Sequence, residues 1–306
     1  MTATVLICTY NRIEILPACL ERVLEAARPH PWVRAVRVID NCSTDGTAER
    51  VRALLSQYPK LHYHYEARPG LSHARNRGAA ESTTDYLCYL DDDACPRDGY
   101  FERAHALLSS APYAAIGGMY YPWYPFGKPR WLPANFATRV SMRPDPGPVD
   151  LPYLSGNNLW IERAALARAG GFDAGFGPQG KRVGYADETN TLQRLLDAGE
   201  RLGFDPDMAI DHAVVQRKMR PEWIFEQAYA QGRDGDRYRF ETLPQALGGW
   251  AKSALGTLVR HLPKAMYRWR KPDYYWQNAL LDTWKPIVHR CGRVAGALRR
   301  KRGGAW

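Results

Sequence analysis

The first 93 residues alternate short apolar segments with longer segments whose apolar positions recur every three or four residues. Such alternation is typical of βαβ units and of a largely parallel sheet. The short segments predict strands at residues 4–10, 33–40, 61–67 and 85–93. The longer ones predict helices at residues 14–27, 47–58 and 70–83. The N-terminal part is therefore predicted to be a Rossmann-like α/β domain, with a mostly parallel sheet flanked by helices.

The pattern changes after residue 120. Residues 120–150 are rich in proline and aromatic side chains, which indicates an ordered loop or flap. Residues 153–173 predict a strand, a Gly-Asn-Asn turn and a short helix, and residues 201–214 predict a strand pair that ends at His212. Beyond residue 216 the pattern is helical. We expect a domain at residues 1–215 and a helical C-terminal extension at residues 216–306.

Polar residues follow three of the predicted strands: Tyr10, Asn11 and Arg12 after the first, Asp40 at the end of the second, and Asp91, Asp92 and Asp93 after the fourth. Open parallel sheets bind ligands at the carboxyl ends of their strands. The three successive aspartates would carry about three negative charges within about 7 Å of extended chain. A divalent cation such as Mg²⁺ or Mn²⁺ would neutralise them and bridge to substrate phosphates. The alternative is a solvated acidic loop.

Two further residues favour a nucleotide site. Asp40 could accept hydrogen bonds from a base or a ribose, and Arg75 lies on a predicted helix near the same sheet edge, where it could pair with phosphate.

Seven motifs occur in an order that resembles glycosyltransferase family 2: "TYNR", "DNCSTDGT", "GLSHARNRG", "YLDDDACP", "GNN", "ADET" and "DPDMAIDH". The resemblance extends from residue 4 to about residue 235. It implies the GT-A fold, a divalent metal, and inverting transfer of a sugar from a nucleotide-diphosphate donor.

The resemblance also implies residue roles. It implies that the donor is contacted by Thr9, Tyr10, Arg12, Asp40, Arg75, Asp91 and Asp92, with Asp91 on the ribose or the metal. It implies that Asp93 and His212 bind the metal, although a single histidine after a strand is often structural. It implies an acceptor or sugar pocket lined by Gly156, Asn157 and Asn158. The aromatic loop that contains Trp131 offers a flat face on which a sugar ring could pack, as an acceptor flap. Gly-Asn-Asn is also simply a good tight turn, and a tryptophan can equally belong to the core.

An inverting displacement needs a general base for the acceptor hydroxyl. The family supplies it from an acidic pair at the start of a helix. Here the pair is Asp187-Glu188 rather than Glu-Asp, and counting back from Arg194 places Glu188 at the base position, with Asp187 just before it. The swapped order leaves the choice between them open, and acids at a helix start are also stabilised by the helix dipole.

The net charge of +10 lies entirely in residues 259–306, which hold 12 Lys and Arg against 2 Asp. Such a tail indicates an anionic partner. One helical stripe, interrupted by Pro286, is formed by Trp276, Leu280, Trp284, Val288, Cys291, Ala295 and Leu298. With the basic residues opposite, it resembles an interfacial membrane helix, and the alternative is that it packs on the transferase domain. No nucleic-acid-binding motif accompanies the charge, so we expect no nucleic-acid partner.

The sequence begins without a basic leader and has no apolar run of about 18 residues, so we expect a cytoplasmic protein. If the basic C-terminal helices contact the membrane rather than pack on the transferase domain, the protein would be peripheral on the cytoplasmic face of the inner membrane. The six cysteines form no C-x-x-C pair, which fits reduced thiols. The processive members of the family carry a Gln-x-x-Arg-Trp motif. This chain has "QGRDGDR" instead, so we expect transfer of one sugar per encounter rather than synthesis of a polymer.

Together these features predict an inverting, non-processive glycosyltransferase of polysaccharide biosynthesis. It would move a sugar from a UDP-sugar donor to a glycan or lipid-linked acceptor. Two alternatives are a nucleotidyltransferase, for which a Gly-rich triphosphate loop is missing, and an inactive sugar-nucleotide or membrane-binding module.

Overall fold

The computed structural model describes residues 1–178, 183–239 and 241–301, which divide into two units. The first unit consists of residues 1–123, 137–174 and 187–213, and the described residues of 124–136, 175–186 and 214–306 form the second. The predicted division at residue 215 differs in that residues 124–136 and 175–186 belong with the C-terminal helices. Hydrogen bonds explain this, because Asn278 Nδ2 donates to the Trp131 carbonyl (2.7 Å) and Arg233 Nη2 to the Val183 carbonyl (2.9 Å).

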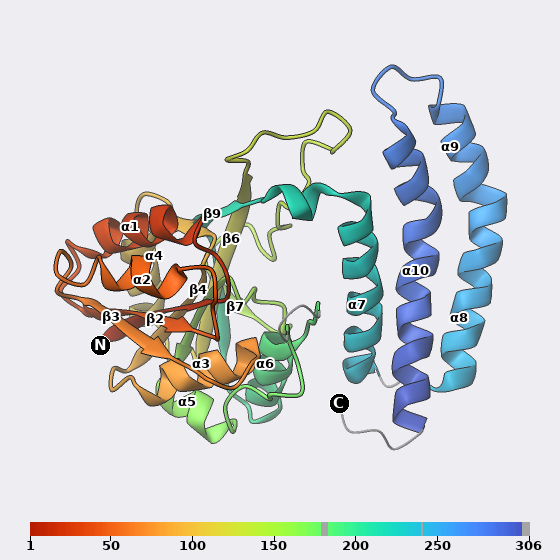
Figure 1. The fold of residues 1–306 in the computed structure, drawn as a ribbon. Coiled ribbons are helices and arrows are strands. Elements are labelled where there is room, and N and C mark those ends of the chain that lie inside the picture. The colour runs from red at the N-terminus through yellow and green to blue at the C-terminus, as the bar shows by residue number, and fades with distance from the viewer. Residues whose placement is uncertain (179–182, 240, 302–306) are drawn as a thin grey trace. The chain divides into compact units, whose positions relative to one another are not determined.

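The first unit contains a mixed sheet. Its described strands are β1 (Ala3–Thr9), β2 (Val33–Asp40), β3 (Leu61–Tyr65), β4 (Tyr86–Asp91), β5 (Ala94–Pro96), β6 (Ala115–Trp123), β7 (Gly147–Val149), β8 (Asn158–Glu162) and β9 (Leu202–Ala213). Their order is β3-β2-β1-β4-β8-β6-β9-β5, and β7 pairs with β9 (Figure 1). The strands β1 to β4 are parallel, so their carboxyl ends meet at one edge, whereas β8 runs antiparallel to β4.

Helices cover both faces of this sheet. The helices of the first unit are α1 (Leu16–Ala27), α2 (Thr47–Arg52), α3 (Leu71–Ala80), α4 (Tyr100–Ser110), α5 (Arg163–Arg168) and α6 (Asp187–Asp197). Successive strand side chains point to opposite faces, so Val5 and Ile7 of β1 join one core cluster and Leu6 joins the other. Helices α1, α2 and α4 lie over the first cluster, and α3, α5 and α6 over the second (Figure 1). The predicted α/β architecture is confirmed.

Three local predictions were wrong. The strand expected before the Gly-Asn-Asn turn follows it instead, because β8 begins at Asn158. In place of a strand pair at residues 201–214 there is one long strand, β9 (Leu202–Ala213), because a register irregularity opposite β6 accommodates "DPDM" without a turn. The expected loop after residue 120 begins later, since the pairing of β6 with β9 continues through Pro122, which lies opposite His212.

The second unit is helical, with η1 (Gln216–Met219), α7 (Pro221–Arg239), α8 (Leu243–Gly256), the π-turn η2 (Thr257–His261), α9 (Leu262–Arg268) and α10 (Trp276–Lys301). Two glycines bring α7 and α10 together: a Cβ on Gly232 would lie 2.0 Å from the His289 carbonyl oxygen, and a Cβ on Gly292 would lie 2.0 Å from that of Tyr229. The predicted interruption at Pro286 was wrong. Pro286 removes one helical hydrogen bond, but packing against both α7 and α8 holds α10 continuous.

Among the helices described, none combines the length and apolarity that crossing a membrane requires.

Candidate active site

Strand pairing brings the predicted metal ligands together. Asp91 is the last residue of β4, and Asp93 lies in the turn between β4 and β5. The antiparallel pairing of β5 with β9 places His212 opposite Ala94, and the Ala213 N–H donates to the Asp93 carbonyl at 2.8 Å. Residues far apart in sequence are therefore fixed side by side by backbone hydrogen bonds.

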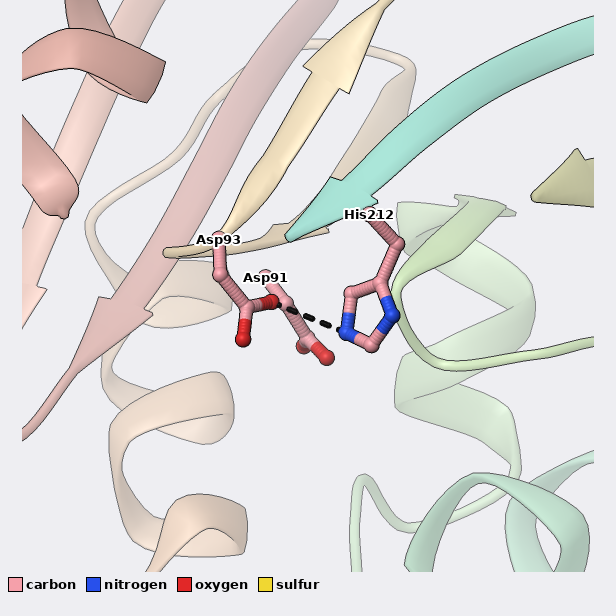
Figure 2. A group of neighbouring side chains, drawn as sticks. All are labelled: Asp91, Asp93 and His212. Carbon is pink, nitrogen blue, oxygen red and sulfur yellow. Dashed lines mark ion pairs between the residues drawn. The ribbon is translucent and has the colours of Figure 1, made fainter. Parts of the chain in front are cut away.

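Asp91, Asp93 and His212 form one group, in which a ligand atom from each lies within 4.8 Å of the others (Figure 2). His212 Nε2 is 3.0 Å from Asp93 Oδ1. Two carboxylates and an imidazole are a donor set that suits Mn²⁺ or Mg²⁺. The Asp93 side chain is 2% exposed and that of Asp91 is 39% exposed. The residues thus fit a divalent cation with one side open toward a substrate.

Asp92 points to a different set of partners. It accepts a hydrogen bond from Thr9 Oγ1 (2.8 Å), and Arg12 Nε lies 3.5 Å from its other oxygen. Burial raises the pKa of Asp92, and the Arg12 guanidinium opposes that rise. Asp92 therefore ties the end of β1 to the end of β4.

The loops after β1 and β2 are also joined. Asn11 adopts a left-handed backbone (φ 53°), and its side-chain oxygen accepts from the Thr44 N–H at 2.8 Å. Asp40 is fully buried at the end of β2, where it accepts from the Ser43 N–H (2.9 Å) and the Tyr63 hydroxyl (2.8 Å). Tyr10 is 38% exposed beside these loops. The three predicted strand ends thus meet along one edge.

Arg75 connects the metal-type group to the acidic pair. This α3 side chain is buried, and its guanidinium donates to Asp187 and to the Gly156 carbonyl (3.2 Å). Its nitrogens also lie 3.8 Å from Asp91 Oδ1 and 3.9 Å from Glu188 Oε2. The predicted contact of Arg75 with the donor stays a prediction, whereas its contact with both acidic clusters was not foreseen.

Asp187 and Glu188 open α6 but differ in environment. The Asp187 side chain is 4% exposed and held by Arg75, whereas that of Glu188 is 22% exposed. Burial raises the pKa of Glu188 to about 8, the Asp187 carboxylate adds to the rise, and Arg75 opposes it. Glu188 is thus the more exposed carboxyl group of the pair, and burial raises its pKa.

Gly156 and Asn158 of the Gly-Asn-Asn segment have packing roles, and the predicted place of the segment in a sugar or acceptor pocket stays a prediction. A Cβ on Gly156 would lie 2.4 Å from Arg75 Nη2, so only glycine leaves room for the guanidinium. Asn158 is fully buried, accepts from the Tyr100 hydroxyl (2.8 Å), and donates to two backbone carbonyls. Asn157 is 7% exposed, and within the described residues its side-chain oxygen has no hydrogen-bond partner.

Trp131 lies in the second unit, where it is 9% exposed. Its predicted role at an acceptor stays a prediction. Tyr120 was missed: its ring meets that of His212 edge-on at 5.8 Å. No local motif marks Tyr120, because the pairing of β6 with β9 creates this contact.

The first unit is thus a Rossmann-like α/β sheet with an acidic group at its carboxyl edge that could hold a divalent metal. The model of the family "Glycosyl transferase family 2" matches residues 4–169. The chain therefore belongs to glycosyl transferase family 2, and the predictions of family and enzyme class are confirmed.

Individual relatives agree with this placement. Glycosyltransferase AglE of Haloferax volcanii is 33% identical over 125 residues, which are 40% of this chain and 41% of AglE. The chain spans about two fifths of the length of the first curated relatives that it matches.

Solved structures show the same fold. The mannosyltransferase PcManGT of Pyrobaculum calidifontis, in complex with GDP-Man and Mn²⁺, superposes with a TM-score of 0.65 at 20% identity, covering 98% of this chain and 86% of its own. A TarS fragment of S. aureus in complex with UDP-GlcNAc gives a TM-score of 0.56 at 13% identity, and the superposition covers 99% of this chain and 93% of the TarS fragment. The predicted GT-A fold is confirmed.

Proposed function

We propose that the chain catalyses metal-dependent, inverting transfer of one sugar per encounter from a nucleoside-diphosphate donor to a hydroxyl of a glycan or a lipid-linked acceptor. The observation that carries this proposal is the position of Arg75. Its guanidinium lies 3.8 Å from Asp91 in the metal-type group and 3.9 Å from Glu188. A donor site and a candidate base therefore face each other across one buried cation.

Glu188 is proposed as the general base. A base must reach the acceptor hydroxyl and be able to take its proton near the working pH. Glu188 satisfies both conditions, since its side chain is partly exposed and burial raises its pKa. Asp187 is proposed to position Arg75, because it is buried against that guanidinium.

Asp91, Asp93 and His212 are proposed to hold Mn²⁺ or Mg²⁺. A bound divalent cation supplies charge neutralisation for the departing diphosphate. The fully buried Asp40 orders the loop after β2, which is proposed to receive the nucleotide base.

The donor is proposed to be a UDP-sugar, with a GDP-sugar as the second candidate. The TarS structure contains UDP-GlcNAc and the PcManGT structure contains GDP-Man, and these similarities support both nucleotides. Calorimetric titration of UDP, GDP and dTDP, each with and without Mn²⁺, distinguishes them by which one binds in a metal-dependent way.

The transfer reaction is tested with Glu188→Gln. The assay measures nucleoside diphosphate released from UDP- and GDP-sugars, with a membrane lipid extract as the source of acceptor hydroxyls. The variant should bind nucleotide with unchanged affinity but transfer about 10²- to 10⁴-fold more slowly, as expected for loss of a general base. Asp197→Asn at the exposed end of α6 is the matched control and should leave the rate unchanged.

Three results would contradict the proposal. If Glu188→Gln transfers at the wild-type rate, Glu188 is not the base. If nucleotide binds but no donor sugar is consumed by the wild-type chain, the inactive binding module is the better description. Release of pyrophosphate from a nucleoside triphosphate would favour nucleotidyl transfer instead.

A further inference from the structure

The helix that runs from α8 through η2 to α9 exposes large apolar side chains at helical spacing. Over half of each side chain is accessible in Leu255 (63%), Leu258 (65%), Val259 (64%), Met266 (72%), Tyr267 (69%) and Trp269 (58%). Trp250 and Leu247 extend the same surface toward the start of α8, at 40% and 47% exposure. Small or buried residues, among them Ala246, Thr257 and Ala265, lie on the opposite side. We call this surface the α8–α9 apolar face.

The charge around this face has one sign. Residues 243–272 contain no Asp or Glu and six basic residues: Lys252, Arg260, Lys264, Arg268, Arg270 and Lys271. Arg268 pairs with Asp282 at 3.0 Å. The other five make no ion pair with any carboxylate in the part of the chain that the structure describes. Their charge is therefore available to an external anion.

A cationic hollow lies along the flank of the same helix. It has a volume of about 520 Å³ between α7, α8 and α10, and its charged lining is Lys252, Lys285 and Arg290, with His289 beside them. Arg290 Nη1 lies 3.7 Å from Glu241 Oε1. The hollow is large enough for a phosphate head group and carries the charge to bind one.

We infer that the α8–α9 apolar face docks on an anionic lipid bilayer, with the helix lying in the plane of the head groups. Apolar side chains flanked by Lys and Arg, with tryptophan at the boundary, are what interfacial membrane helices require. A second copy of this chain is a poorer occupant, since two such faces would bring ten unpaired like charges together. Nucleic acid would use the charge but would leave the leucines in water.

This surface differs from the stripe that the sequence placed on α10. In that stripe Leu280, Val288, Cys291 and Ala295 are half-buried, since α10 packs between α7 and α8. Its other three members, Trp276 (57%), Trp284 (49%) and Leu298 (38%), are exposed. The α8–α9 apolar face is more exposed and has no carboxylate among its own residues. The inference is independent of the proposed transfer reaction.

The test is co-flotation of the full chain with vesicles of phosphatidylcholine alone or of phosphatidylcholine with phosphatidylglycerol. We expect binding to the anionic vesicles, together with quenching of tryptophan fluorescence by brominated lipid. Leu255→Gln/Leu258→Gln/Met266→Gln should weaken binding about a hundredfold. Arg260→Gln/Lys264→Gln/Lys271→Gln should do the same, at roughly fivefold per cation removed.

Matched controls exclude general effects. Val140→Gln/Leu151→Gln removes exposed apolar side chains, and Arg34→Gln/Arg50→Gln removes exposed cations, all from the first unit. Both should bind vesicles like the wild type, and circular dichroism should report an unchanged fold for every variant.

Three outcomes would overturn the inference. They are absence of vesicle binding, binding that the apolar triple variant does not weaken, and concentration-dependent self-association that this variant abolishes. Donor binding by the same samples separates such a failure from a failure of the proposed transferase function.

Discussion

The proposed role of Glu188 as general base predicts how transfer should depend on pH. A general base acts only when deprotonated, so transfer is lost as the pH falls through its pKa. An ordinary glutamate has a pKa of about 4.3, and its transfer would be independent of pH across the neutral range. Burial raises the pKa of Glu188 to about 8, with the Asp187 carboxylate adding to the rise. We therefore expect an acid limb in the neutral range.

The size of the effect follows from this pKa. At pH 7 only about a tenth of a carboxyl group with a pKa near 8 is ionised, so kcat/KM should rise about tenfold between pH 7 and a plateau above pH 8. Arg75 Nη1, 3.9 Å from Glu188 Oε2, limits the rise because it stabilises the carboxylate.

The assay is kcat/KM for nucleoside diphosphate release at saturating Mn²⁺, measured from pH 5 to pH 9 in buffers of constant ionic strength. Nucleotide affinity measured at each pH separates loss of binding from loss of the base. Glu188→Gln should transfer slowly at every pH, and its kcat/KM should not fall between pH 8 and pH 6 as that of the wild type does. A wild-type limb that lies near pH 4 to 5, or that persists in Glu188→Gln, would refute the assignment.

Three further predictions concern metal binding and stability. Asp93→Ala should abolish metal-dependent nucleotide binding in calorimetry, whereas retained Mn²⁺ dependence would remove Asp93 from the ligand set. Gly232→Ala should lower the melting temperature, because its Cβ would lie 2.0 Å from the His289 carbonyl oxygen. Gly235→Ala on the same helix meets nothing within 4 Å and should be neutral or stabilising by up to about 1 kcal/mol, so equal melting temperatures would contradict the predicted packing. Glu188→Gln should raise the melting temperature at pH 8. The pKa of Glu188 is higher in the folded state than in the unfolded state, so its ionisation destabilises the folded state increasingly as the pH rises above the unfolded pKa. The amide of glutamine does not ionise and removes this cost.

The spacing of apolar residues was sufficient to predict several helices and strands of the first unit. The strands at β1 and β2 and the helix α1 follow directly from apolar spacing, and their predicted bounds are within two residues of those observed. Expectations that depended on pairing were less accurate. β9 remains one strand because its pairing with β6 continues on both sides of "DPDM", and no propensity within that segment reveals its partner.

The candidate site divides in the same way. The aspartates after β4 could be located by their position at a strand end, because parallel topology brings strand ends together. The contacts of Arg75 could not be located from the sequence, because they depend on α3, the Gly156 backbone and α6 converging in space. Tyr63 on Asp40 and Tyr120 on His212 were missed for the same reason. The assigned residue roles, the membrane contact and the cytoplasmic location remain predictions.

The unusual Asp-Glu order at the start of α6 has a physical explanation in this arrangement. The first position of the pair faces Arg75 in the interior, where the shorter aspartate fits with only 4% of its side chain exposed. The second position faces outward, where the additional methylene of glutamate carries the carboxylate to 22% exposure while Arg75 stays within 3.9 Å. Reversing the order would place the longer side chain in the buried space and withdraw the carboxylate of the proposed base from solvent. The order is therefore consistent with a division of roles, in which Asp187 holds the cation and Glu188 accepts the proton.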